Sequence, residues 1–524
     1  MRRRDALKLA AAALAAPRFA SAQPVQTLRF VPSSDLSLLD PVATTAAITR
    51  NHAYLVWDTL YGVDDAFTIQ PQMLEGHEAN ADHTDWTLTL REGLRFHDGA
   101  PVLGRDVVAS IGRWAKRDVF GDALMQATGE LSAPTDRTVR FRMKRGFALL
   151  PAALSKIPPY MPCIMPERLA ATDAFTQVTE IVGSGPFRFL PGERVPGSRA
   201  VYEKFSGYVP RPSGRTEQTA GPKIAYVDRV EWITMPDAST VAGALQTGEV
   251  DWWESPSPDL QPLLRRNKNI VMEVREKAGY VPILRFNALF PPFDNPAVRR
   301  AVLRAVDQSQ FMLTYSDDRA MWRDRMGVFP PDTPMATDAG MAGLFGATDA
   351  ARAHRELAEA GYKGERVVFM VAGDSLASGM LSPVAEDLFK KIGLTVDYQM
   401  VDLGTLYQRR ASQKPPEAGG WNCFIIGFNG ADLLDPAVSS LVRGNGLKGW
   451  YGWPTSAELE ALHAAWFEAG DEAAQRAVCE RIQLQVWQDA PYVPLGQIFL
   501  PTAYSKSVTG MLDGFPKFYN VRKG

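Results

Sequence analysis

The segment Leu94-Arg95-Phe96-His97-Asp98-Gly99-Ala100-Pro101 decides the local fold in the N-terminal part of this 524-residue chain. Asp98-Gly99 suits a tight turn, because glycine adopts the positive φ that such turns need. Just before the segment, residues 86–90 alternate polar and apolar side chains, which predicts a strand. Just after it, residues 101–114 carry apolar side chains at helical spacing. The segment is therefore predicted to be a turn between a strand and a helix.

A second pattern follows in the C-terminal half of the chain. Residues 351–360 and 383–392 read as helices, residues 367–371 read as a buried strand, and residues 394–401 read as a second strand. This alternation predicts an α/β unit with crossover helices. About 500 residues exceed what one hydrophobic core usually holds, so we expect two or more lobes.

The first 22 residues predict a cleaved export signal. Arg2, Arg3 and Arg4 precede a short apolar run, and Ala20-Ser21-Ala22 has the small-residue pattern of a cleavage site. The run is too short to span a bilayer, which needs about 20 apolar residues. Arg3 to Lys8 resembles a twin-arginine signal, and an ordinary secretory signal is the alternative. On either route the protein leaves the cytoplasm.

Charge and cysteine content exclude several classes of function. The signal carries five basic residues and one acidic residue, so its removal shifts the net charge from -2 to about -6. A mildly acidic surface argues against nucleic acid or an anionic membrane as a partner. Cys163, Cys423 and Cys479 allow one disulfide, but the sequence does not choose the pair. There is neither a CxxC nor an HExxH motif, so we expect no metal and no cofactor.

Five segments in order resemble the dipeptide, oligopeptide and nickel-binding family of periplasmic ABC-transporter substrate-binding proteins. The resemblance extends over nearly the whole chain after residue 22. The matching segments are Leu38 to Pro41, Leu94 to Pro101 with Asp106-Val107, Gly183 to Phe187, Leu245 to Asp251, and Phe293 to Arg300.

The resemblance implies an α/β (mixed α+β) fold with the two lobes of a type II-like periplasmic binding protein. The first lobe would comprise residues 23–280 and 490–524, with an extra subdomain inserted at about 59–182. The second lobe would comprise residues 281–489. A small organic solute, a peptide or another amine-bearing molecule, would be trapped between the lobes by hinge closure. The protein would act as a monomer in the periplasm and deliver the solute to ABC permease subunits in the inner membrane.

The resemblance also implies a carboxylate that meets the amino group of the ligand. Asp432, four residues before Pro436, occupies the matching place after the buried strand that ends near Phe428, with one extra residue after Gly427. A buried carboxylate–ammonium contact is a strong, charge-assisted hydrogen bond. The alternative is that Asp432 or Asp435 only caps the next helix start, around Pro436.

Aromatic and basic residues near Asp432 are further candidates for ligand binding. Aromatic side chains offer large apolar contact at low entropic cost, and lobe cores use them as well. An arginine there would hold a ligand carboxylate through a bidentate fork, unless the adjacent pair is simply solvated. The candidates are Trp421, Phe428, Trp450, Tyr451, Trp453, Arg409 and Arg410.

Two other functions stay open as alternatives. Gly373-Asp374-Ser375-Leu376 copies the nucleophile block of a lipase-esterase family, which would make the protein a serine hydrolase. That chemistry needs a downstream Asp-x-x-His element, and the only later histidine is His463, on a predicted helix. We therefore expect no enzyme and no catalytic residue. The second alternative is a binding protein that serves a sensor, and the sequence leaves the solute unidentified.

Overall fold

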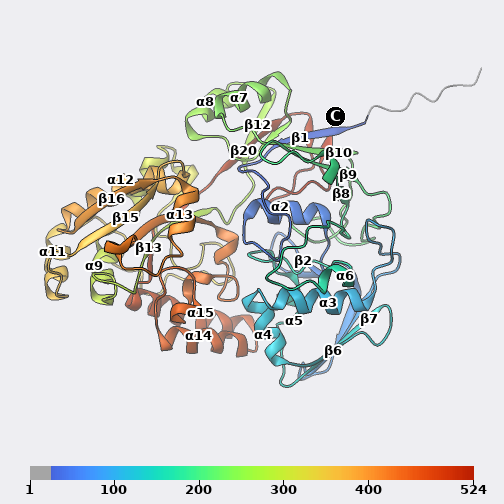
Figure 1. Ribbon diagram of the computed structural model, residues 1–524, viewed down its shortest axis with the longest axis horizontal. Helices are drawn as coiled ribbons and strands as arrows, with labels where there is room; N and C mark the ends of the chain where they lie inside the picture. Colours follow the sequence, from blue (N-terminus) through green and yellow to red (C-terminus); the bar gives the residue numbers. More distant parts are fainter. Residues whose placement is uncertain (1–24) are drawn as a thin grey trace, which may run out of the picture.

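The computed structural model describes residues 25–524, so the predicted export signal at residues 1–22 lies outside the described residues. Figure 1 shows two halves side by side, each built on its own seven-stranded sheet. We call them the first lobe and the second lobe. The mixed α/β, two-lobed fold predicted from the sequence is confirmed.

The first lobe is built on a mixed sheet near the start of the chain. Its strands, in spatial order, are β12 (Ile270–Val274), β20 (Pro501–Ser505), β11 (Trp252–Trp253), β1 (Thr27–Val31), β10 (Arg229–Ile233), β9 (Arg199–Lys204) and β8 (Phe187–Phe189). Strand β1 runs parallel to both of its neighbours. Its helices are α2 (Ala47–Val56), α7 (Ala238–Thr247) and α8 (Gln261–Arg265). Phe30, Trp232, Trp252 and Phe518 form an aromatic cluster under the sheet, so the C-terminal segment completes this core.

The second lobe contains the predicted α/β unit. Its strands are β14 (Trp322–Arg323), β19 (Gln497–Ile498), β13 (Tyr280–Phe286), β17 (Cys423–Asn429), β15 (Arg366–Ala372), β16 (Thr395–Val401) and β18 (Tyr492–Pro494), which pairs with β13. Its helices are α9 (Pro296–Ala305), α10 (Gln308–Tyr315), α11 (Ala350–Glu359), α12 (Leu376–Lys391), α13 (Leu403–Arg409), α14 (Ala457–Glu468) and α15 (Glu472–Asp489). Strand β15 is parallel to β16 and β17, as crossover helices require. Helix α12 begins before the predicted residue 383, because Ser375 caps it and Pro383 is accommodated inside it.

A separate four-stranded sheet lies between β1 and β8 in sequence. It contains β4 (Leu74–Ala79), β5 (Asp85–Leu90), β7 (Thr138–Met143) and β6 (Thr128–Ser132), beside the hairpin of β2 (Tyr61–Val63) and β3 (Ile69–Pro71). Its helices are α3 (Gly104–Ala115), α4 (Val119–Ala127), α5 (Leu150–Ser155) and α6 (Glu167–Ala170). The predicted strand, turn and helix around residues 94–101 are present as β5, a turn with Gly99 at φ +89, and α3. We call residues 59–182 the inserted subdomain.

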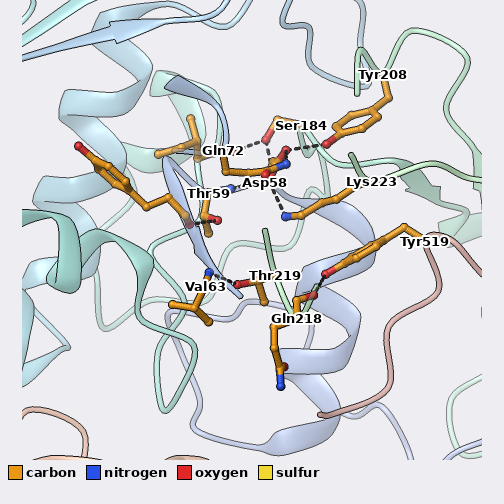
Figure 2. Close-up of polar contacts among 12 residues, drawn as sticks. Asp58, Thr59, Val63, Gln72, Ser184, Tyr208, Gln218, Thr219, Lys223 and Tyr519 are labelled. Atoms are coloured by element: carbon orange, nitrogen blue, oxygen red, sulfur yellow. Dashed lines mark hydrogen bonds and ion pairs between the residues drawn. The ribbon is translucent and has the colours of Figure 1, made fainter. Parts of the chain in front are cut away.

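One buried ion pair joins the subdomain to the first lobe, and a second lies within the first lobe. Arg113 of α3 donates to both carboxylate oxygens of Asp40, at 3.2 and 2.7 Å. Figure 2 shows a second pair, in which Lys223 Nζ lies 2.7 Å from Asp58 Oδ1 and Tyr208 donates to Asp58 Oδ2 at 2.7 Å. Burial alone would raise the pKa of Asp58, but Lys223 and these hydrogen bonds hold it below its ordinary value. These contacts give Asp40 and Asp58 structural roles.

The chain passes between the two sheets at two adjacent points. It leaves the first sheet after β12 and enters the second at β13, and it returns between β19 and β20. The expected return at residue 490 differs from this arrangement. Strands β18 and β19 pair with β13, so residues 492–498 belong to the sheet of the second lobe.

The lobes also touch on the side away from these two crossings. Phe120 of α4 packs against Phe467 of α14, with ring centroids 5.3 Å apart. Lys156 of the inserted subdomain donates to the carbonyl of Ala437 at 3.4 Å. Figure 1 shows α14 beside α4 at the same place. Over residues 25–524 the structure has no helix with the length and apolar character to cross a membrane.

Candidate functional site

A cavity of about 90 Å³ lies next to the two points where the chain crosses between the lobes. Residues of both lobes line it, together with the crossing segments themselves. They include Arg50, Trp252, Glu254, Thr502 and Phe515 from the first lobe, Arg275, Glu276 and Gly279 from a crossing segment, and Tyr280 and Asn429 from the second lobe. A molecule held here would contact both lobes at once.

Helix α2 brings Arg50 to the cavity. Every residue of this helix after Ala47 is buried, so its polar side chains must find partners inside the molecule. Arg50 is 8% exposed, and its guanidinium carbon lies 4.4 Å from the centre of the Phe515 ring. Its Nε and Nη2 both donate to Asn51 Oδ1, at 3.3 and 3.1 Å. Within residues 25–524 the guanidinium forms no ion pair with a carboxylate.

Three carboxylates surround this part of the molecule. Glu254 accepts hydrogen bonds from the Ser33 amide at 2.7 Å and from Asn51 Nδ2 at 3.1 Å. Glu276 accepts one from the Ala278 amide at 3.1 Å, and Asp432 accepts one from Asn429 Nδ2 at 3.4 Å. Burial raises the pKa of all three carboxyls, and the charge of Arg50 offsets part of that rise. None of the three has an ion-pair partner among the residues that the structure describes.

Asp432 lies within a short 3₁₀ helix, Gly430–Leu433, that directly follows β17. Its hydrogen-bond donor, Asn429, is itself a cavity residue, so Asp432 stands directly behind the lining. Asp435 has a different role, because its Oδ1 accepts the Ala437 and Val438 amides at 2.8 and 3.1 Å. Asp435 is therefore the residue that caps the turn at Pro436.

The aromatic candidates separate into two groups. Trp421 and Trp453 are buried in the core of the second lobe. Phe428, Trp450 and Tyr451 are partly exposed, and Trp450 packs against both of the others at 5.4 Å between ring centroids. These three are the aromatic candidates with surface to offer a solute.

The two candidate arginines also differ. Arg409 donates to the carbonyls of Gly419 and Gly420 at 3.0 and 2.7 Å, so it holds a loop in place. The Arg410 guanidinium lies over the rings of Tyr407 and Tyr451, at 4.4 and 4.5 Å from their centroids. Burial lowers the pKa of Arg410, although these aromatic neighbours favour its charge.

Ser375 and the cysteines have structural surroundings. The Ser375 hydroxyl accepts the Ser378 amide at 3.4 Å as the cap of α12, and His463 Nε2 lies 3.1 Å from the carbonyl oxygen of Pro436. Each is committed to a local contact, so the hydrolase alternative gains no support. Cys163, Cys423 and Cys479 are buried free thiols, and no disulfide joins them. Between residues 25 and 524 no group of three or more metal-ligating side chains is assembled.

Sequence reasoning missed Arg50, Glu254, Glu276 and Tyr280. One signal was present for Arg50, because Thr49-Arg50-Asn51-His52 is a polar run followed by the apolar residues 53–56. A buried helix with such a run must direct polar groups inward, as this one does. No comparable signal marked Glu276, whose place depends on where the chain crosses between the lobes.

Comparison with known proteins agrees with this architecture. Residues 68–446 match the family model described as "Bacterial extracellular solute-binding proteins, family 5 Middle". The chain belongs to this family. A probable peptide ABC transporter periplasmic-binding protein of Sinorhizobium fredii is 35% identical over 99% of both chains. A glutathione-binding protein of Salmonella paratyphi A is 25% identical over 96% of this chain and 94% of its own length.

Solved structures of this family share the fold. A dipeptide-binding protein of Pseudoalteromonas sp. SM9913, in complex with Met-Leu, superposes with a TM-score of 0.78 at 19% identity, over 95% of this chain and 100% of its own. A binding protein of A. tumefaciens R10 in complex with agropinic acid gives 0.76 at 21% identity, over 95% and 99%. The predicted resemblance to the dipeptide, oligopeptide and nickel-binding family is confirmed, and the chain is a family 5 solute-binding protein.

Proposed function

We propose that this family 5 protein is the periplasmic, monomeric binding component of an ABC importer. It captures a peptide or another amine-bearing solute between its lobes and delivers it chemically unaltered to the permease. The observation that carries the proposal is the cavity beside the two crossings, lined from both lobes and containing buried charges without ion-pair partners. The export signal predicted at residues 1–22 is consistent with this location.

The solute class is proposed from two sources. The relative from Sinorhizobium fredii carries the name of a peptide transporter component, and the Salmonella relative is named for glutathione. Independently, Asp432 and Glu276 present carboxylates near the cavity, which suits an ammonium group. A peptide with a free amino terminus meets both requirements. A role in sensing in place of import would use the same site.

The proposed mechanism is closure of the lobes about the two crossings. The cavity is smaller than the roughly 300–1,000 Å³ of sites for drug-sized ligands, so a peptide needs the lobes to part before it enters. A solute that contacts both lobes then favours the closed arrangement through its differential affinity. The contact of Phe120 with Phe467 marks how far closure can proceed.

A binding assay on the mature protein tests the proposal. Thermal unfolding is followed in the presence of dipeptides, glutathione, opines and nickel chelates, each at a series of concentrations. A true ligand at a hundredfold its Kd stabilises the fold by about 2.7 kcal/mol. The solute is then recovered from the protein and analysed by mass spectrometry. We expect saturable binding of an amine-bearing solute with unchanged mass, and steady conversion of any solute to product would contradict the proposal.

A further inference from the structure

Arg50 carries a buried positive charge, and no carboxylate of residues 25–524 lies within ion-pair distance of it. Its guanidinium is held on one side by the Phe515 ring and on another by Asn51 Oδ1. Through residues 25–524 no protein group accepts a hydrogen bond from its Nη1, although the side chain lines the cavity. Burying a charge is costly unless it is paired and hydrogen-bonded. The open side of this guanidinium therefore calls for an anion.

The nearby carboxylates do not meet that need. Glu254 contacts α2 through Asn51, and its two carboxylate oxygens already accept hydrogen bonds from Ser33 and Asn51. Glu276 and Asp432 belong to the crossing segment and the second lobe, where each accepts one hydrogen bond from a neutral donor. All three leave the guanidinium outside ion-pair distance.

The other bases near the cavity have partners of their own. Arg275 pairs with Glu273 and Asp513, and Lys517 donates to the carbonyl of Asp513 at 2.6 Å. Lys517 also lies 4.1 Å from the Phe515 ring centre, on the ring that Arg50 contacts. Among residues 25–524, Arg50 is therefore the cavity-lining base without a carboxylate partner.

We propose that Arg50 binds the carboxylate of the solute, so that the site takes dipolar molecules. A guanidinium suits this role, because its planar donor fork matches the two oxygens of a carboxylate. The ammonium of the same solute faces Glu276 and Asp432 across the cavity. The inferred ligand class is therefore a short peptide or amino-acid derivative with both a free amino group and a free acid. This inference rests on the proposed function and adds the second anchor of the site, on the lobe opposite Asp432.

The experiment measures preference between acid and amide. Mature wild-type protein is equilibrated with two equimolar random dipeptide libraries, one of free acids and one of the corresponding C-terminal amides. Bound dipeptides are identified by native mass spectrometry, and the affinity of the best free acid and of its amide is measured by calorimetry. The variants are Arg50→Met and Arg50→Lys, with Arg188→Met, at the exposed position of strand β8, as the matched control.

We expect wild type to bind the free acid at least tenfold more tightly than its amide. Arg50→Met should abolish that preference, Arg50→Lys should retain part of it, and Arg188→Met should keep it whole. Circular dichroism and the thermal midpoint verify that the variants fold. If Arg50→Met does not fold, the comparison of acid and amide is made with Arg50→Lys.

Three outcomes would overturn the inference. Equal wild-type affinity for acid and amide removes the carboxylate contact but leaves the proposed function standing. An undiminished acid preference in Arg50→Met assigns the contact to another residue, again without loss of the proposed function. Wild-type protein that retains no dipeptide from either library contradicts both the inference and the peptide assignment.

Discussion

Individual charged residues in this protein are explained by what surrounds them more than by their type. Asp40 and Asp58 hold buried basic partners and so serve the fold, whereas Asp432 has only an amide donor. In the sequence, Asp432 was proposed as a ligand residue because a family pattern pointed to its position. Arg50 was not, because the open side of its guanidinium depends on Phe515, which is far away along the chain. Asp432 was therefore proposed from a sequence pattern, whereas the proposal for Arg50 depends on tertiary contacts.

Replacement of Asp432 by asparagine is predicted to weaken binding of an amine-bearing dipeptide by about 10- to 100-fold. The reason is the loss of a charge-assisted hydrogen bond, worth about 1.5–3 kcal/mol. Titration calorimetry on Asp432→Asn measures the effect. Asp136→Asn, at an exposed position, is the control and should bind as wild type does. Unchanged affinity in Asp432→Asn would remove this residue from the site.

The buried His97 is predicted to make the fold less stable as the pH falls from about 6.5 to 4. Its Nε2 lies 3.0 Å from the carbonyl oxygen of Gly185, and burial lowers its pKa to about 4. Below pH 6.5 the unfolded chain takes up a proton that the folded protein resists, so the free energy of unfolding decreases with falling pH. The loss attributable to this residue reaches about 3 kcal/mol at pH 4.

Urea unfolding of His97→Gln at several pH values checks this prediction. The variant should show a shallower decrease in stability than wild type between pH 6.5 and 4. His354→Gln, at an exposed position, is the control and should follow the wild-type curve. A His97→Gln curve parallel to that of wild type would show that this histidine does not contribute to the acid sensitivity.

At the scale of elements, local sequence patterns were enough to predict individual helices, strands and turns. Helix α3, the strands β15 and β16, and the turn at Gly99 all follow from local patterns. The pairing of β13 with β17 does not, since its register joins residues far apart in the sequence. That register is what brings Tyr280 opposite Asn429 at the cavity, so the site could not be assembled from local signals alone.

Lys223→Met is predicted to destabilise the protein by about 3–5 kcal/mol. The substitution leaves Asp58 buried without its cation, and an unpaired buried charge is costly. Denaturant unfolding measures the change, and the double variant with Asp58→Asn should recover part of it. Lys391→Met breaks an exposed pair with Asp387 and should cost at most about 1 kcal/mol. Equal effects of the two lysine substitutions would refute the structural role assigned to the network in Figure 2.

Gly427→Ala is predicted to weaken solute binding by at least about tenfold through a change in Tyr280. A Cβ at this position would lie 2.0 Å from Tyr280 Cζ, so the ring, which lines the cavity, must move. Overpacking of this kind costs about 1–3 kcal/mol of stability as well. Gly243→Ala, where an added Cβ meets no atom within 4 Å, is the control. Wild-type affinity in Gly427→Ala, measured by calorimetry, would show that Tyr280 does not shape the site.

At the scale of the whole molecule, chain length and the ordered family segments were enough to predict two lobes with an inserted subdomain. The placement of the C-terminal crossing was less accurate. Strands β18 and β19 are only three and two residues long, and strands that short carry little periodic signal. They extend the second sheet before the chain returns at β20. The two crossings therefore lie beside each other, where a hinge needs them.

The most direct test of lobe closure is a distance between spin labels on the two lobes, measured by pulsed electron resonance. Labels are attached to Glu249→Cys in the first lobe and Lys363→Cys in the second, both exposed positions. The three native thiols are buried, which favours labelling at the introduced sites. We predict a broad distribution of distances without solute and a single narrower, shorter one with a saturating dipeptide that the calorimetry has shown to bind. An identical distribution in both samples would contradict the account.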